Sequence, residues 1–157
     1  MKTRLLVLAS IVIGVVVLAA CGGSPASSPV ERTIYMAAVE PKGGVTVDKE
    51  SFPSSQLPEG GGYILKQPDD TGRWEVSTYR FEPATIVVNQ GDIVTLEIVG
   101  INGANHPFSV EGYDVNGTIT RGKITRVTFT ADKAGIFKIL CSTHLPTMTG
   151  YLVVLAP

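Results

Sequence analysis

Short runs of alternating apolar and polar residues, separated by turns, are the feature that most constrains the fold of this chain. Val94, Leu96 and Ile98 alternate with other residues, two of them polar, so they share one face of an extended segment. The same period of two recurs in residues 125–130 and 137–141, whereas no segment after the N-terminal region shows a convincing helical period. Strands joined by turns without helices predict an all-β Greek-key sandwich or barrel.

Other segments predict further strands and one long loop. Residues 32–39, 63–67 and 73–79 are expected to be strands, and residues 53–62 (PSSQLPEGGG) are expected to be a loop. Residues 150–155 are apolar almost throughout, which predicts a strand buried on both faces.

Small and polar residues mark the expected turns. The Asn116-Gly117 pair, between two strand-forming residues, predicts a two-residue hairpin turn. Residues 89–92 (NQGD) and 121–122 (RG) predict two further turns.

The N-terminal segment has the pattern of an export signal. Lys2 and Arg4 precede the apolar residues 5–20, which would span about 24 Å as a helix, less than the ~30 Å hydrocarbon core of a membrane. This pattern predicts a signal peptide over residues 1–20. The Leu-Ala-Ala-Cys sequence that ends at Cys21 resembles the bacterial lipobox, which implies that Cys21 carries lipid such as palmitate. An uncleaved anchor with an incidental cysteine is the alternative.

The rest of the chain divides into a tether and one domain. Residues 21–30 are rich in Gly, Ser and Pro and predict a flexible linker, and residues 31–157 predict a single domain with its core in residues 79–157. We therefore expect a periplasmic protein, lipid-anchored on the extracytoplasmic side of a bacterial membrane. Removal of residues 1–20 leaves eleven basic and fourteen acidic residues. This balance argues against nucleic acid as a partner.

Both histidines, one cysteine and one methionine predict a metal site. Cys141, His144 and Met148 form a C-x2-H-x3-M motif, and His106 lies 35 residues upstream of Cys141. If Cys21 is lipidated, Cys141 is the only free thiol in an oxidising compartment and requires a reason. A thiolate, two imidazoles and a distant thioether form the ligand set of an electron-transfer copper site. Taken singly, each of these residues is as readily explained by packing or by surface hydrogen bonding.

Three stretches carry a resemblance to the cupredoxin family of blue copper proteins. They are residues 81–92 (FEPATIVVNQGD), residues 128–135 (TFTADKAG) and residues 141–150 (CSTHLPTMTG). The resemblance as a whole runs from about residue 79 to residue 155. It implies a cupredoxin-like sandwich and one type 1 copper ion. The implied ligands are His106 and His144 as imidazoles, Cys141 as thiolate and Met148 as axial thioether.

Neighbouring residues complete the predicted site. We expect the Ser142 and Thr143 amides and Asn105 to surround the ligands, and we assign Trp74 and the five tyrosines to core packing. Residues 106–113 also resemble the binuclear copper domains of nitrous oxide reductase and cytochrome oxidase subunit II. A binuclear site requires two cysteines in one loop, whereas this loop contains only Cys141.

These features favour an electron carrier that is not an enzyme. Its expected partners are redox proteins of a respiratory or photosynthetic chain and the membrane that holds its lipid. Copper storage or delivery to a neighbouring oxidase or reductase is the alternative. A copper enzyme would need an open coordination position or a second metal. A mononuclear copper site with an acidic ligand such as Glu111 is a remote variant, and zinc gains nothing from a methionine ligand.

Overall fold

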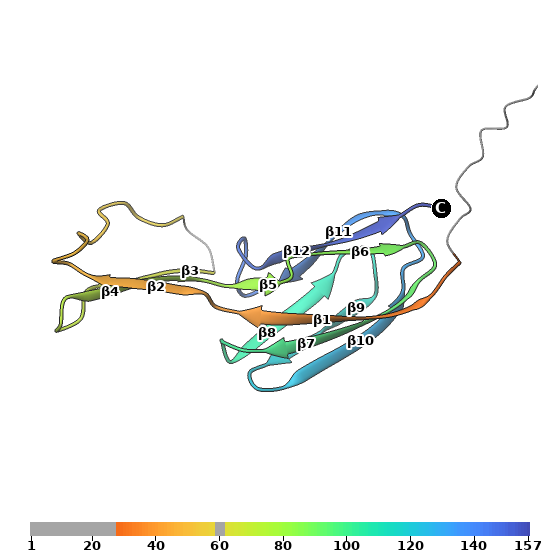
Figure 1. The fold of residues 1–157 in the computed structure, drawn as a ribbon, viewed down its shortest axis with the longest axis horizontal. Coiled ribbons are helices and arrows are strands. Elements are labelled where there is room, and N and C mark those ends of the chain that lie inside the picture. The colour runs from red at the N-terminus through yellow and green to blue at the C-terminus, as the bar shows by residue number, and fades with distance from the viewer. Residues whose placement is uncertain (1–27, 59–61) are drawn as a thin grey trace, which may run out of the picture.

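The computed structural model describes residues 28–58 and 62–157, and within these ranges the chain forms twelve strands and no helix (Figure 1). The strands are β1 (Glu31–Val39), β2 (Lys42–Thr46), β3 (Tyr63–Lys66), β4 (Arg73–Thr78), β5 (Arg80–Glu82), β6 (Thr85–Asn89), β7 (Ile93–Gly100), β8 (Asn105–Val110), β9 (Val115–Thr120), β10 (Ile124–Thr130), β11 (Gly135–Cys141) and β12 (Thr149–Leu155). The predicted signal peptide and the lipidation site at Cys21 lie outside the described residues. The described part contains no helix of the length and hydropathy needed to cross a membrane.

Two of the sheets face each other as a sandwich. The first sheet has the order β10-β7-β1-β5, and the second has the order β6-β12-β11-β8-β9. β1 runs parallel to β7, and β6 runs parallel to β12, whereas the other pairs are antiparallel. The prediction of an all-β fold is therefore confirmed.

The core forms between the two sheets because alternate residues of each strand point inward. Leu96 and Ile98 of β7 are fully buried, and they belong to one cluster with Ile139 of β11 and Leu152 of β12. The same cluster includes Met36 of β1, so the core extends beyond the expected residues 79–157.

The prediction that residues 150–155 are buried on both faces is wrong. Tyr151 and Leu155 are 41% and 47% exposed, whereas Leu152 and Val154 are buried. β12 pairs with β6 and β11 on its two edges, but only one face of this sheet packs against the other sheet.

The predicted hairpin turn at Asn116-Gly117 is also wrong, because both residues lie inside β9 and pair with β8. A Cβ at Gly117 would lie 3.0 Å from the Phe108 ring, so the glycine leaves space for a core side chain. The chain reverses instead at residues 111–114, where Gly112 has a φ of +75° that favours glycine.

The strands β2, β4 and β3 form a third, small sheet that we call the arm. Figure 1 shows the arm projecting from the end of the sandwich opposite the C-terminus. Trp74 packs here against Phe52, with ring centroids 6.0 Å apart, and its indole N–H donates to the carbonyl of Glu50. Trp74 therefore fills the arm and not the core of the sandwich.

Candidate metal centre

The predicted ligands come from two neighbouring strands and the loop that follows one of them. His106 lies in β8, Cys141 is the last residue of β11, and His144 and Met148 lie in the loop before β12. Backbone hydrogen bonds close this loop: the Cys141 N–H donates to the Met148 carbonyl, and the Met148 N–H donates to the His144 carbonyl. The C-x2-H-x3-M spacing thus forms a compact turn whose residues are held by their own backbone.

Three donor atoms converge at the end of the sandwich. The Cys141 Sγ lies 3.3 Å from the His144 Nδ1 and 3.9 Å from the His106 Nδ1, and the two Nδ1 atoms are 3.1 Å apart. An ion with bonds of about 2.0–2.3 Å to nitrogen and sulfur requires donors about 3–4 Å apart. The side chains of His106, Cys141 and His144 therefore fit one metal ion.

Burial differs among the four predicted ligands. His106, Cys141 and Met148 are fully buried, whereas His144 is half-buried and lies nearest to solvent. The structure places Met148 at the base of the loop, immediately before β12. Its assignment as the axial ligand stays a prediction.

The environment favours charged thiolate and imidazolium groups at two of these positions. Burial opposes ionisation of the Cys141 thiol, but hydrogen bonds with His106 and Thr143 outweigh it and lower the pKa of Cys141. Burial also opposes protonation of His106, but the contact with Cys141 and the Asn102 carbonyl raise the pKa of His106. Burial and the nearby His106 lower the pKa of His144.

The residues expected around the ligands take different places. The Thr143 hydroxyl, a group other than the amide named from the sequence, lies 3.3 Å from the Cys141 sulfur, where a hydrogen bond can tune the ligand. The Ser142 N–H instead donates to the Pro107 carbonyl at 3.0 Å and so ties the loop to β8. Asn105 accepts a hydrogen bond from Thr120 at the exposed edge, because its side chain points to β9.

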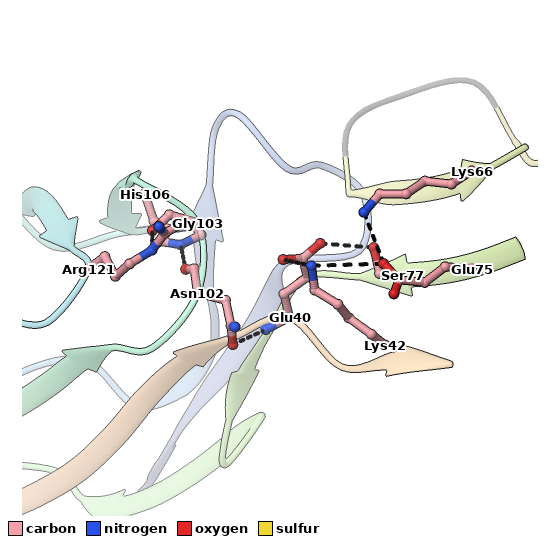
Figure 2. A network of polar contacts seen from close by, with 9 residues as sticks. All are labelled: Glu40, Lys42, Lys66, Glu75, Ser77, Asn102, Gly103, His106 and Arg121. Carbon is pink, nitrogen blue, oxygen red and sulfur yellow. Dashed lines mark hydrogen bonds and ion pairs between the residues drawn. The ribbon is translucent and has the colours of Figure 1, made fainter. Parts of the chain in front are cut away.

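Sequence reasoning missed two neighbours of the imidazoles. The Tyr79 ring stacks on the His144 ring, with centroids 3.9 Å apart and an interplanar angle of 23°. The His106 Nε2 donates to the Asn102 carbonyl at 2.6 Å, which leaves Nδ1 free to accept a metal (Figure 2). No motif marks either residue, although Asn102 is the one polar side chain of the short loop before β8.

A family model described as a cupredoxin-like domain matches residues 51–154. The chain belongs to the cupredoxin family. Comparison of the sequence with curated proteins finds no significant match.

Solved structures of copper proteins share the fold of this cupredoxin. The copper nitrite reductase from Nitrosomonas europaea matches with 17% identity and a TM-score of 0.52, over 80% of this chain and 42% of the reductase. A blue copper oxidase from the same organism matches with 16% identity and a TM-score of 0.51, over 80% of this chain and 39% of the oxidase. The chain thus spans about two fifths of the length of these enzymes.

A smaller protein matches over nearly its full length. Auracyanin A, a blue copper protein from Chloroflexus aurantiacus, is 16% identical with a TM-score of 0.47, and the match covers 80% of this chain and 99% of auracyanin. At identities this low, the matches with TM-scores of 0.52 and 0.51 show likeness of fold alone.

Proposed function

We propose that this cupredoxin binds one type 1 copper ion and carries single electrons between redox partner proteins. His106, Cys141 and His144 would hold the ion, with Met148 as a weak axial ligand. The observation that carries the proposal is the convergence of two imidazole nitrogens and one sulfur at 3.1–3.9 Å. Soft sulfur together with imidazole selects copper over harder ions. Bound copper would supply one-electron exchange between Cu(I) and Cu(II).

The chain holds these donors so that they move little when the charge of the site changes. The ligand loop is closed by its own backbone and is tied to β8 by the hydrogen bond from Ser142 to Pro107. His106 is fixed from behind by the Asn102 carbonyl. A donor set held in this way limits the rearrangement that accompanies electron transfer.

The half-buried His144 provides a route for electrons between the site and the surface. Leu145, which is 39% exposed, and the exposed Pro146 follow it directly and form an apolar rim. A small apolar rim suits the brief, low-area contacts of redox partners. We assign such proteins, from a respiratory or photosynthetic chain, as the partners.

This proposal assigns no catalytic reaction to the chain. A catalytic copper or zinc centre keeps a coordination position open for water or substrate. Here the Met148 side chain is buried at the base of the ligand loop, and the sequence has no third histidine. Glu111 lies exposed in the turn after β8, at the other end of that strand from His106.

The proposal includes a lipid anchor on Cys21 that holds the domain on the extracytoplasmic side of the membrane. β1 begins at the end of the sandwich opposite the arm (Figure 1). The metal centre lies beside Tyr79, which directly follows β4 of the arm. A tether at the start of β1 would therefore leave the His144 rim accessible to partners.

A copper titration tests the proposed centre. We expect one copper per chain and an intense visible sulfur-to-copper band, with the electron paramagnetic resonance signal of a type 1 site. The band should be lost in Cys141→Ser and kept in Cys21→Ser, the matched control that removes the other cysteine. Wild-type protein that binds Cu(II) without this band would contradict the proposal.

Fractionation and exchange measurements test the remaining parts. The Cys21→Ser variant should be lost from the membrane fraction of cells, whereas the Cys141→Ser variant should remain in that fraction. Fast electron self-exchange supports a carrier, and faster transfer of copper to an acceptor protein would support delivery instead.

A further inference from the structure

Tyr79 lies between the arm and the metal centre. It directly follows β4 of the arm, and its ring stacks on His144 with centroids 3.9 Å apart. The same ring contacts His106, with centroids 5.5 Å apart and an angle of 58°. Tyr79 therefore touches both predicted imidazole ligands from one side.

The Tyr79 ring restrains His144 by covering one of its faces. His106 is held through Nε2 by a backbone carbonyl, whereas the hydrogen-bond contacts of the His144 ring in the described residues all involve Nδ1. Nδ1 is the atom that faces Cys141 and the proposed ion. The orientation of the His144 ring therefore depends on the stacking of Tyr79 against one of its faces.

Tyr79 is itself held by the base of the arm. Its N–H donates to the Gly62 carbonyl at 3.1 Å. Burial and the charge of Glu40 raise the pKa of the Tyr79 hydroxyl. The Glu40 side chain is only 7% exposed; it accepts a hydrogen bond from Ser77 at 2.9 Å and forms an ion pair with Lys42 at 3.1 Å (Figure 2). These contacts fix the position from which the ring stacks.

The same carboxylate residue reaches the second imidazole. The Glu40 N–H donates to the Asn102 side chain at 3.1 Å, and the Asn102 carbonyl accepts from His106 at 2.6 Å (Figure 2). The base of the arm is thus connected to both imidazoles, through Tyr79 on one side and Asn102 on the other.

We propose that Tyr79 is a positioning residue that fixes the His144 ring by stacking and thereby sets the reduction potential of the copper centre. The proposal rests on the proposed copper-binding function. Cu(II) favours tetragonal coordination, whereas this donor set is compact and nearly triangular. A His144 ring that can turn lets the site relax towards the geometry that Cu(II) prefers, so the potential falls when the stack is lost.

Three variants separate stacking from general packing. Tyr79→Leu removes the ring, and Tyr79→Phe keeps the ring without the hydroxyl. Tyr113→Leu is the matched control, because Tyr113 packs between Phe129 and Phe137 with centroids 5.0 Å from each, beyond the end of β8 that is far from His106.

The first measurement uses metal-free protein. Nuclear magnetic resonance should show cross-relaxation between the Tyr79 and His144 ring protons in the wild type, which requires no substitution. The ring-current shift of the His144 protons should disappear in Tyr79→Leu and persist in Tyr79→Phe and Tyr113→Leu. Absence of the cross-relaxation, or equal His144 shifts in the two leucine variants, would overturn the proposal.

The second measurement is the reduction potential of the copper-loaded variants. Tyr79→Leu should raise the Cu(II) affinity relative to Cu(I) at least about threefold, a fall of about 30 mV. Tyr79→Phe and Tyr113→Leu should stay near the wild-type value. A potential that does not fall in Tyr79→Leu would overturn the positioning role. Failure of the wild type to bind copper would refute the proposed function, while the metal-free spectra would still decide whether Tyr79 orients His144.

Discussion

Replacement of Gly103 by alanine should damage the metal centre through a single added methyl group. Gly103 has a φ of +73°, and a Cβ there would lie 2.6 Å from both the Cε1 and Nε2 atoms of His106. It would also lie 3.1 Å from the Tyr79 ring. Gly122 is a matched control, since its φ is +72° and a Cβ there would meet nothing within 4 Å.

The two variants share one energetic cost and differ in the other. The left-handed backbone costs alanine about 1–2 kcal/mol of unfolding free energy at either position. Gly103→Ala adds the overlap with His106, which cannot move freely because its ring is buried and its Nε2 is bound to Asn102. Overpacking of this kind costs about 1–3 kcal/mol. We therefore expect a loss of about 1–2 kcal/mol for Gly122→Ala and about 2–5 kcal/mol for Gly103→Ala.

Denaturant unfolding of the metal-free proteins measures the difference in stability between the two variants. Competition titration measures the difference in their copper affinity. Gly103→Ala should weaken copper binding at least about tenfold, equivalent to about 1.4 kcal/mol, because the His106 Nδ1 must leave its place 3.1 Å from the His144 Nδ1. Gly122→Ala should bind copper as the wild type does. Equal stability losses together with equal copper affinities would show that the Gly103 contact does not position His106.

Three further outcomes follow from the core and from the titrating groups. Leu96→Ala empties a fully buried site and should cost about 2–5 kcal/mol in denaturant unfolding, while the copper spectrum of the folded variant stays unchanged; a smaller loss would contradict the assigned core. Burial opposes the charge of Asp92, but Arg32 and backbone N–H groups outweigh it and lower the pKa of Asp92. The stabilisation that Asp92 gives the fold is therefore complete above its unfolded pKa of about 4. It is lost as the pH falls through the lower pKa of the native state. Asp92→Asn should therefore be less stable at neutral pH and flatten the acid limb of a stability–pH curve, and an unchanged curve would refute this role. Burial opposes protonation of His106, yet the contact with Cys141 raises the pKa of His106. Because a proton on His106 competes with the metal, copper affinity should fall about tenfold per pH unit below that pKa in competition titrations. A flat pH profile would argue against His106 as a ligand.

Much of the fold could be predicted from local pattern. The alternation around Leu96 in β7 and around Ile139 in β11 identified inward-facing residues, because side chains on a strand alternate regardless of the neighbouring strand. The same local pattern failed at residues 150–155, where apolar residues on the outer face of β12 are exposed. It also failed at Gly117, which lies inside β9 and pairs with Phe108 of β8.

For the candidate metal centre, too, some features follow from the sequence and others from the tertiary structure. The sequence by itself determined the donor types and the compact loop from Cys141 to Met148, because ligand chemistry and short spacing are local properties. Only the tertiary structure brought His106 to 3.9 Å from the sulfur and stacked Tyr79 on His144, since these contacts arise from strand pairings between distant segments. Residue types decide which ion a chain can bind, and long-range packing decides which neighbours hold the ligands in place.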